Sequence, residues 1–353
     1  MNEQMNKQLP QEPESPASGK PKKRFSAAVS GYFTKKISDF RADFSKKPDE
    51  MKHQWKAWLY LSPALILLIV FSFYPLINTF RMAFLNGYNG LAVLGGEKFD
   101  VGIQNFKTVI NNVDFKLYLK NTVLLCVLTV PVSTTLAMLI AVALNSIKPL
   151  QKIFQTVFFL PYVTNAIAIG MVFNAMFTRV GVGELVQTQG IINNIIGIFG
   201  IAPINFVNVG STWGANMFVV CVYIVWKALP FKILVLLGGL QNVNKQYYEA
   251  AKIDGTSRTR TFFRITVPLV SPMLAYVIIT SFIGGFKEYS SIVGIFGEGM
   301  GPNGQMNTIV GYVYNMLPKS NLGNASAASL ILFAIILVVT AINGYVSKKK
   351  VHY

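Results

Sequence analysis

Long apolar runs alternate with shorter polar segments along most of this chain. Six of the runs are long enough to cross the hydrocarbon core of a bilayer, which takes about 20 apolar residues in a helix. They cover roughly residues 57–80, 119–144, 153–178, 211–240, 268–287 and 325–346. A spanning segment must satisfy its own backbone hydrogen bonds, and these runs lack the strict alternation of a membrane barrel strand. The pattern therefore predicts an all-α integral membrane protein with six transmembrane helices.

The composition supports a membrane protein and excludes some kinds of site. Of the 353 residues, 52% are hydrophobic and 13% are charged, whereas a soluble domain has about 25% charged residues. Cys126 and Cys221 each fall within an apolar run, where a cysteine is typically a small packing residue. His53 and His352 are the only histidines, which excludes a histidine-based metal cluster.

The formal net charge of +17 is unevenly distributed, and this argues against nucleic-acid binding. Of the 32 lysines and arginines, 22 fall in residues 1–56, 145–152, 241–267 and 347–353, which six spans place on one side of the membrane. The positive-inside rule predicts that both termini are cytoplasmic. The first apolar run starts only near residue 57 and is too long for the core of a cleavable signal peptide. We expect a multi-pass membrane protein.

The first 56 residues form a basic tail that we expect to be cytoplasmic. Within it, residues 25–47 have apolar side chains every three or four positions with lysine and arginine between them, which predicts a basic amphipathic helix. Three interpretations remain open for this helix: contact with the anionic inner leaflet, docking on a partner, or a solvated tail.

The cytoplasmic segment 241–267, with the start of the run that follows it, contains the stretch "EAAKIDGTSRTRTFFRITVP", residues 249–268. It predicts a short helix, a turn at Gly255 and a second short helix that Thr256 or Ser257 caps. Positive-inside bias alone explains its arginines. It does not explain the "YYEAA" that precedes the glycine or the aromatic residues that follow it, so we expect a docking surface for another protein.

The spacing of this stretch resembles the EAA signature of membrane subunits of ABC importers. That signature has E-A-A, three residues, G, nine residues and I-x-L-P, and the chain departs from it only at Val267 in place of leucine. The preceding "LGGLQNVNKQYYEAAKIDG" and the later "GPNGQMNTIVGYVY" resemble the carbohydrate-uptake branch, of the maltose permease type. The resemblance covers roughly residues 55–346.

The resemblance implies the type I importer permease fold, with 57–346 as the permease domain and 241–267 as a coupling loop that seats on a cytoplasmic ATPase. The residues it assigns to coupling are Glu249, Ala250, Ala251, Asp254, Gly255, Arg258, Ile265 and Pro268. It also implies a second related permease subunit, two ATPase subunits and an extracytoplasmic sugar-binding protein. This chain has no G-x-x-x-x-G-K-[ST] phosphate loop, so ATP and Mg²⁺ are expected only on the partner ATPase.

Polar residues inside the predicted spans are candidates for the cargo path, since they are costly in lipid. Pro230 is expected to kink or break the fourth span, and broken helices often form transporter binding sites. The candidates are Trp226, Lys227, Phe231, Ser281, Gly285, Glu288 and Tyr289. Counted from the EAA motif, positions 226–231 and 281–288 match positions that hold sugar in the maltose type, but Gly285 and Glu288 replace the polar amides of that family, so its exact sugar contacts do not transfer. Thr164, Asn165 and Asn174 are further candidates. Lys227 and Lys232 also fit an internal ion pair or snorkelling, and Ser281 also fits helix packing.

The sequence therefore predicts the permease subunit of an ATP-driven importer of a sugar or oligosaccharide, a transporter rather than an enzyme. One alternative keeps this architecture with a polyol or a glycerol 3-phosphate-like solute as the cargo. Two others, less favoured, are an ion-coupled secondary transporter and a membrane scaffold whose basic loop binds a partner.

Overall fold

The computed structural model describes residues 48–147, 151–182 and 185–350. The predicted amphipathic helix at 25–47 lies outside the described residues. The chain divides into two compact units, Met1–Pro75 and Leu76–Tyr353. In the first, helix α2 (Pro48–Leu68) leads through one π-helical turn (Ile69–Phe73) to the start of α3 (Tyr74–Ala83). The apolar stretch Trp55–Ala83 is long enough to cross a membrane.

The second unit contains three long, continuous helices: α6 (Val113–Ser146), α10 (Trp213–Gln241) and α17 (Leu322–Lys350). Each has a stretch that is apolar and long enough to span a bilayer. Together with Trp55–Ala83, the described residues hold four such helices, or up to six if each of two bent helix pairs is one span.

The two bent pairs correspond to the third and fifth predicted spans. In the first pair, α7 (Gln151–Val163) and α8 (Ala166–Phe177) meet at 96°. In the second, α12 (Arg258–Thr261), a π-helical turn (Phe262–Thr266) and α13 (Val267–Leu269) meet α14 (Ser271–Phe286) at 70°. Asn165 lies at the first break. Its extended backbone interrupts the helical path after α7, and its Oδ1 caps α8 by accepting the N–H groups of Ile167 and Ala168.

Pro230 does not break its helix. Helix α10 continues from Trp213 to Gln241 with Pro230 buried inside it, so the expected break in this span is wrong. A proline removes one backbone donor, and neighbouring helices can compensate for this loss within a packed bundle. The breaks occur instead at Asn165 and Val270, where a side-chain cap or a change of backbone angle ends the helix.

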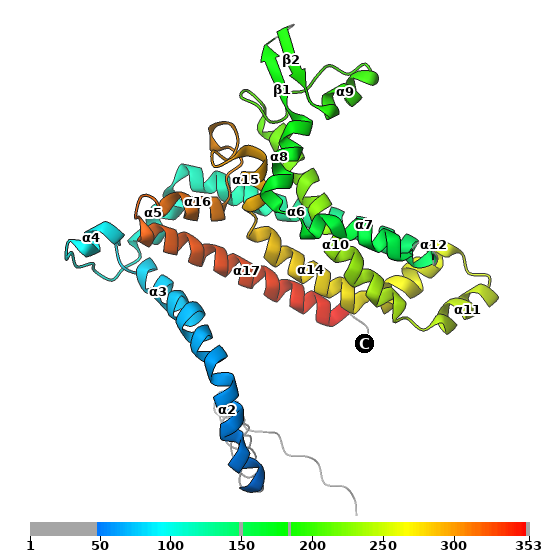
Figure 1. The fold of residues 1–353 in the computed structure, drawn as a ribbon, viewed down its shortest axis with the longest axis horizontal. Coiled ribbons are helices and arrows are strands. Elements are labelled where there is room, and N and C mark those ends of the chain that lie inside the picture. The colour runs from blue at the N-terminus through cyan, green and yellow to red at the C-terminus, as the bar shows by residue number, and fades with distance from the viewer. Residues whose placement is uncertain (1–47, 148–150, 183–184, 351–353) are drawn as a thin grey trace, which may run out of the picture. The chain divides into compact units, whose positions relative to one another are not determined.

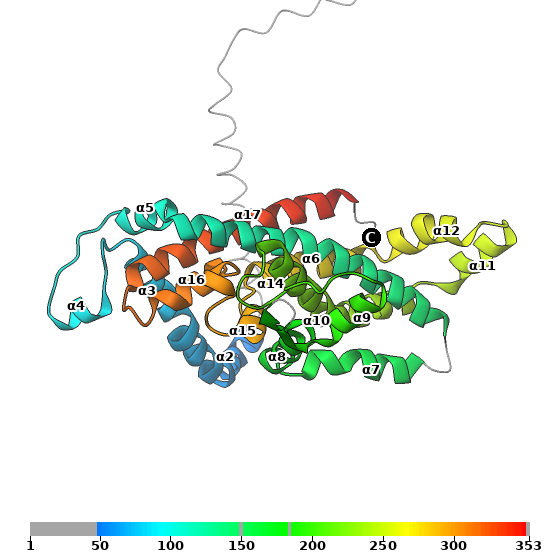
Figure 2. The ribbon, with the colours of Figure 1, turned by 90° about the horizontal axis from the view of Figure 1, so that it is seen from above.

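Helix α6 is the centre of the second unit. Helix α10 packs along it, α14 packs on α6 and on α17, and the four helices run beside one another (Figures 1 and 2). One apolar core joins α6, α10 and α14 through Ala137, Ile233 and Val277, all of them buried. Close-packed helices leave few voids between them, so a cavity among these helices is a candidate site.

Short elements lie at the two ends of these helices. Helices α11 (Lys245–Ile253) and α12 lie beyond one end of α10 and α14, whereas α5 (Gln104–Asn111) and α16 (Ile309–Met316) lie at the other end (Figure 1). Helix α4 (Gly90–Leu94), helix α15 (Ser290–Phe296) and a single 3₁₀ turn (Pro302–Gly304) complete the connections.

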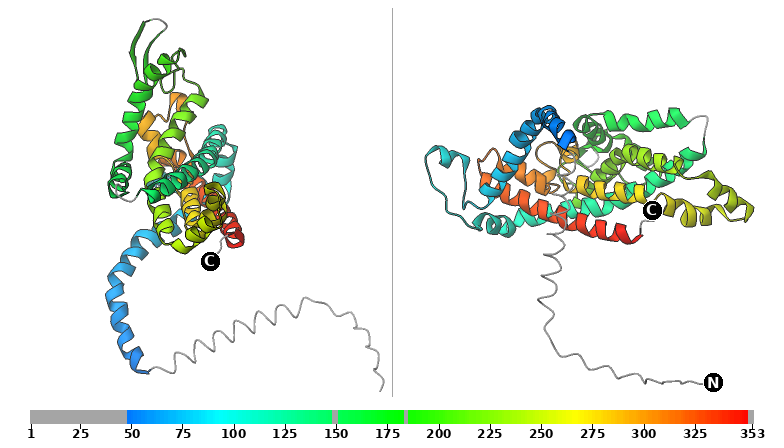
Figure 3. Two further views of the ribbon diagram at one scale, coloured as in Figure 1. Left: turned by 90° about the vertical axis from the view of Figure 1, so that its right-hand side faces the viewer. Right: turned by 90° about the horizontal axis from the view of Figure 1, so that it is seen from below.

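A small β-hairpin qualifies the prediction of an all-helical chain. Strands β1 (Arg179–Val182) and β2 (Leu185–Gln189) pair antiparallel, and α9 (Ile191–Ile198) follows them. Figure 3 shows this hairpin and α9 at the outer end of α8. The sequence pattern does not predict this hairpin, because its strands have only four and five residues.

Candidate functional site

A cavity of about 350 Å³ opens between α6, α7, α10 and α14. Its volume is in the range of small-molecule binding sites, which are about 300–1,000 Å³. The polar residues that line it are Thr129, Ser133, Tyr162, Thr164, Lys227, Lys232, Thr280, Ser281 and Glu288. Hydroxyl groups predominate in this set, and hydroxyls both donate and accept hydrogen bonds, as sugar hydroxyls do.

Aromatic rings form one wall of the cavity. The rings of Tyr162 on α7 and Phe231 on α10 are stacked, with centroids 6.0 Å apart and planes 19° apart. Tyr276 on α14 does not line the cavity, and its ring centroid lies 6.5 Å from that of Phe231. Flat apolar ring faces suit the C–H surfaces of a sugar ring, so the wall and the hydroxyl groups together fit a saccharide.

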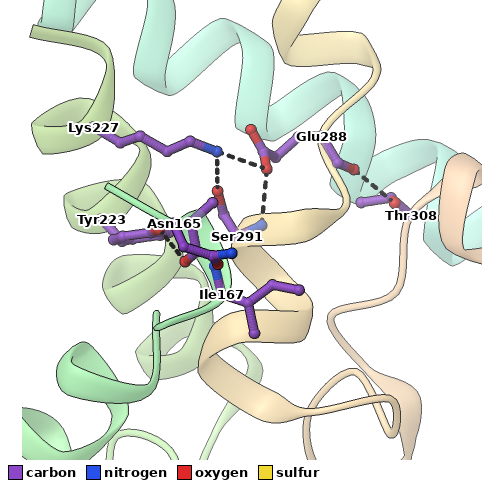
Figure 4. Close-up of polar contacts among 8 residues, drawn as sticks. Asn165, Ile167, Tyr223, Lys227, Glu288, Ser291 and Thr308 are labelled. Carbon is purple, nitrogen blue, oxygen red and sulfur yellow. Dashed lines mark hydrogen bonds and ion pairs between the residues drawn. The ribbon is translucent and has the colours of Figure 1, made fainter. Parts of the chain in front are cut away.

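A charged cluster includes Lys227 and Glu288, two of the residues that line the cavity (Figure 4). Lys227 donates from Nζ to Oγ of Ser291 at 3.1 Å, and its Nζ lies 3.8 Å from Oε1 of Glu288. The same Oε1 accepts the backbone N–H of Ser291 at 3.0 Å, and the carbonyl of Glu288 accepts from the hydroxyl of Thr308. Two of the predicted cargo-path residues therefore form an ion pair that joins α10 to the start of α15.

The structure brings together five of the seven predicted cargo-path residues. Lys227, Phe231, Ser281, Gly285 and Glu288 line the cavity, whereas Trp226 and Tyr289 do not. Trp226 packs against the rings of Phe173 and Tyr223. These contacts are apolar packing of the kind that closes a core, and they keep the indole away from the cavity.

Tyr289 lies beside α15 and stacks on Tyr314, with ring centroids 4.4 Å apart. Burial, with the nearby Tyr314 and Glu298, raises the pKa of Tyr289 above its ordinary value. The ring of Tyr289 has a packing role in the structure.

Two of the cavity residues also have a structural reason for their identity. Ser281 donates from Oγ to the carbonyl of Val277, one turn earlier in α14. A Cβ on Gly285 would lie 2.9 Å from Sγ of Cys126, so glycine at this position lets α14 approach α6 closely. Of the further candidates, only Thr164 lines the cavity. Asn165 and Asn174 have structural roles instead: Asn165 caps α8, and Asn174 donates to the carbonyl of Ile295.

Some cavity residues are absent from the sequence-based prediction, namely Thr129, Ser133, Tyr162 and Thr280. Each is a hydroxyl-bearing residue inside an apolar run. That signal is weak, because serine and threonine in such helices usually bond to their own backbone, as Thr129 does to the carbonyl of Leu125.

The predicted coupling segment folds as two short helices joined by a tight turn. Asn244 caps α11 and Ser257 caps α12, so the expected cap at Thr256 or Ser257 is confirmed for Ser257. Gly255 has a φ of +63°, and its N–H and that of Thr256 bond back to the carbonyls of Lys252 and Ala251. This closes α11 in a Schellman motif, which needs the left-handed backbone that glycine adopts most easily.

The coupling candidates differ in exposure. Glu249, Ala250, Asp254, Gly255 and Arg258 are exposed, Ile265 and Pro268 are half-buried, and Ala251 is buried. Large apolar side chains are exposed nearby as well, with Ile253 at 87% and Phe263 at 64%. Ala251 thus holds α11 against the chain while the remaining exposed residues form a mixed polar and apolar surface.

Comparisons with known proteins agree with this geometry. The family model described as "Binding-protein-dependent transport system inner membrane component" matches residues 133–352. The arabinooligosaccharides transport system permease protein AraP of Bacillus subtilis (strain 168) is 33% identical, over 81% of this chain and 86% of its own length. The lactose transport system permease protein LacF of Rhizobium radiobacter is 30% identical, over 81% of this chain and 91% of its own length.

A solved structure shares the fold. It is a bacterial ABC transporter involved in the import of the acidic polysaccharide alginate, and the match has a TM-score of 0.70 at 21% identity. The match covers 85% of this chain and 97% of that one. A second structure of the bacterial alginate transporter, in complex with an alginate pentasaccharide-bound periplasmic protein, has the same TM-score at 22% identity.

Proposed function

Because the chain belongs to the family of binding-protein-dependent transport system inner membrane components, it is the permease subunit of a sugar ABC importer, and we propose that it conducts an oligosaccharide through the cavity between α6, α7, α10 and α14. The observation that carries the proposal is the lining of this cavity. It combines the stacked rings of Tyr162 and Phe231 with hydroxyls from three helices, in a chain with several membrane-length helices.

The cargo class follows from this chemistry and from the relatives. The names of AraP and LacF refer to arabinooligosaccharides and lactose, which are short saccharides. A saccharide of this size has apolar C–H faces for the aromatic wall and hydroxyls for Thr129, Ser133 and Thr280. A polyol or a glycerol 3-phosphate-like solute remains the alternative cargo, and it would make little use of two stacked rings.

Coupling to ATP is assigned to the α11–α12 hairpin. Its exposed surface from Glu249 to Arg258 would seat on a cytoplasmic ATPase subunit that holds ATP and Mg²⁺. Helix α14 follows α12 and α13 across the 70° bend at Val270 and lines the cavity through Ser281. A movement of the hairpin would therefore reach the cavity along a short, continuous path of helices.

The complete importer is proposed to contain a second related permease subunit, two ATPase subunits and an extracytoplasmic sugar-binding protein. A binding-protein partner is characteristic of the family. Large apolar side chains on α6 and α7, such as Val132 and Ile153, are exposed and would contact lipid or the second permease. Both termini and the α11–α12 hairpin are proposed to be on the cytoplasmic side of the cytoplasmic membrane, as the positive-inside rule requires.

Transport would proceed by alternating access. In this scheme ATP-driven closure of the ATPase pair pushes the hairpins, and the cavity opens to the outside to receive the sugar from its binding protein. Hydrolysis then returns the cavity to the inward-open state. Every chemical step of hydrolysis belongs to the ATPase, while this chain binds, orients and releases the cargo.

The test is reconstitution of the complete importer in proteoliposomes, with arabinotriose, lactose, maltotriose, trigalacturonate and glycerol 3-phosphate as cargoes. The expected result is that at least one oligosaccharide stimulates ATP hydrolysis and enters the vesicles. Deletion of residues 249–258 should abolish both. Uptake that continues without any ATPase subunit would contradict the proposal, and stimulation by glycerol 3-phosphate alone would favour the alternative cargo.

A further inference from the structure

Lys232 is a buried lysine in the wall of the proposed cargo cavity. Its exposed fraction is 3%, and it lies on α10 in contact with α6. Its Nζ donates to Oγ of Ser133 at 2.6 Å and to Oγ1 of Thr134 at 3.1 Å. Burying an ammonium group costs several kcal/mol unless an opposite charge or a full set of acceptors compensates it.

Neither form of compensation is complete for Lys232 in the part of the chain that the structure describes. No described carboxylate oxygen lies within 4.0 Å of its Nζ. An ammonium group has three N–H donors, and the described residues provide acceptors for two of them. The third donor and the positive charge are therefore available to a group in the cavity.

The other charged residues of the cavity do not neutralise Lys232. Glu288 is the acidic residue in the lining, and its Oε1 faces Nζ of Lys227 at 3.8 Å (Figure 4). The lining thus holds two lysines and one glutamate, which leaves one positive charge in excess. Lys227, the more exposed lysine, is paired with the carboxylate of Glu288. Lys232, the more buried one, has only the hydroxyl groups of Ser133 and Thr134 as hydrogen-bond partners among the described residues.

Lys232 shares its helix face with residues already assigned to the cavity. Ile224, Lys227, Ala228 and Phe231 also line it, at spacings of three and four residues along α10. Phe231 and Lys232 both line the cavity, so a sugar ring that stacks on Phe231 would lie in the same cavity as the Lys232 side chain.

We propose that the cargo is a saccharide with an anionic group, a carboxylate or a phosphate, which Lys232 binds with the help of Ser133 and Thr134. This inference rests on the proposed function and specifies the cargo of the same cavity. The two hydroxyls orient the ammonium group, and the anion accepts its remaining N–H. A neutral saccharide fills the same space but leaves the buried charge without a counterion.

The experiment measures equilibrium binding to the importer complex in nanodiscs, without ATP and without the binding protein, so that the permease alone selects. The probes are trigalacturonate, maltotriose as the neutral trisaccharide, and maltose 1-phosphate as the phosphate-bearing sugar. A charge-assisted hydrogen bond is worth about 1.5–3 kcal/mol, so at least one anionic probe should bind about 10-fold to 100-fold more tightly than maltotriose. The two anionic probes distinguish a carboxylate from a phosphate.

The variant Lys232→Met should bring the affinities for anionic and neutral probes to within about threefold of each other. Lys287→Met removes the same charge from an exposed position outside the cavity lining and should keep the preference. Binding of maltotriose to Lys232→Met reports that the variant has folded. Should it fail to fold, Lys232→Gln keeps a donor to the two hydroxyls without the charge, and the same loss of preference is expected.

Two outcomes overturn the inference. One is a wild-type complex that binds maltotriose as tightly as both anionic probes, which is decisive even if no variant folds. The other is a Lys232 variant that keeps the anionic preference. Failure of the proposed function looks different: no saccharide, neutral or anionic, would stimulate ATP hydrolysis by the complete importer. Stimulation by neutral sugars alone would preserve sugar import and reject the role of Lys232.

Discussion

Oε1 of Glu288 lies 3.8 Å from Nζ of Lys227, and this pair joins α10 to the segment that leads from α14 into α15. The carboxylate also accepts the N–H of Ser291, and the lysine donates to the hydroxyl of the same residue. The side chain of Lys227 is 34% exposed and that of Glu288 is 14% exposed, so solvent screens the attraction between the two charges only in part. The pair therefore holds two walls of the cavity in the observed arrangement.

Removing either partner of this pair should destabilise the permease. Lys227→Met and Glu288→Gln are each expected to cost about 1 kcal/mol, which lowers the melting temperature of the purified complex by about 2–4 °C. The double variant should lose less than the sum of the single losses, because the second change removes a group that is already unpaired. Strictly additive losses in this double-mutant cycle would mean that the two charges do not interact.

Gly255 should be replaceable only by a residue that tolerates a left-handed backbone. Its φ is +63°, and a Cβ there would meet no atom within 4 Å, so strain and not space limits the substitution. Gly255→Val is expected to cost about 1–2 kcal/mol and to distort the turn between α11 and α12. The measurement is co-purification with the ATPase, together with sugar-stimulated ATP hydrolysis, and both should fall.

Gly255→Asn is the matched control for this change. Asparagine visits the left-handed region more easily than valine does, so the turn and the ATPase contact should be largely kept. Equal activity of the two variants would remove the turn from the coupling mechanism. Gly255→Pro and Gly255→Asp should uncouple the hairpin and leave membrane insertion intact. Proline in particular cannot adopt a positive φ.

The crossing of α8 and α15 depends on two glycines in contact. A Cβ on Gly170 would lie 2.5 Å from Cα of Gly294, well inside van der Waals contact. Gly170→Ala should therefore force the helices apart at a cost of about 1–3 kcal/mol. The readout is thermal unfolding of the purified complex. Gly238→Ala, on α10 with open space around it, is the control and should be neutral or stabilising.

Asn121 connects the loop before α16 to two helices. Its Nδ2 donates to the carbonyls of Gln305 and Asn307, and its Oδ1 accepts from Nε1 of Trp213. Asn121→Leu would leave these three buried or half-buried groups without their partner, at a cost of about 2–4 kcal/mol. Limited proteolysis should then cut the loop near residues 297–307 faster than in the wild type.

Asn194→Leu is the control for the loop prediction. Asn194 is exposed on α9, so its replacement should leave the rate of cleavage unchanged. If Asn121→Leu is cleaved no faster than the Asn194 variant, the loop is held by apolar contacts such as those of the buried Met306 and not by the asparagine.

The sequence by itself determined the class of the molecule and the local fold of the segment 249–261, two short helices joined by a glycine turn. Apolar runs of about 20 residues can only be helices in a bilayer, because each must satisfy its own backbone hydrogen bonds. The α11–α12 turn was equally predictable, since its geometry depends on neighbouring residues: a left-handed glycine at Gly255 and a capping serine at Ser257.

Only the tertiary structure decided which polar residues share a cavity. Helix α10 continues through Pro230, whereas the bent spans break at Asn165 and Val270. The position of a proline therefore did not predict which spans are bent. Trp226 and Lys227 are neighbours in the sequence, yet one packs into a core and the other lines the cavity. The physical reason is helix rotation: each residue turns its side chain by about 100°, so packing against α6, α8 and α14 selects which side chains face the cavity.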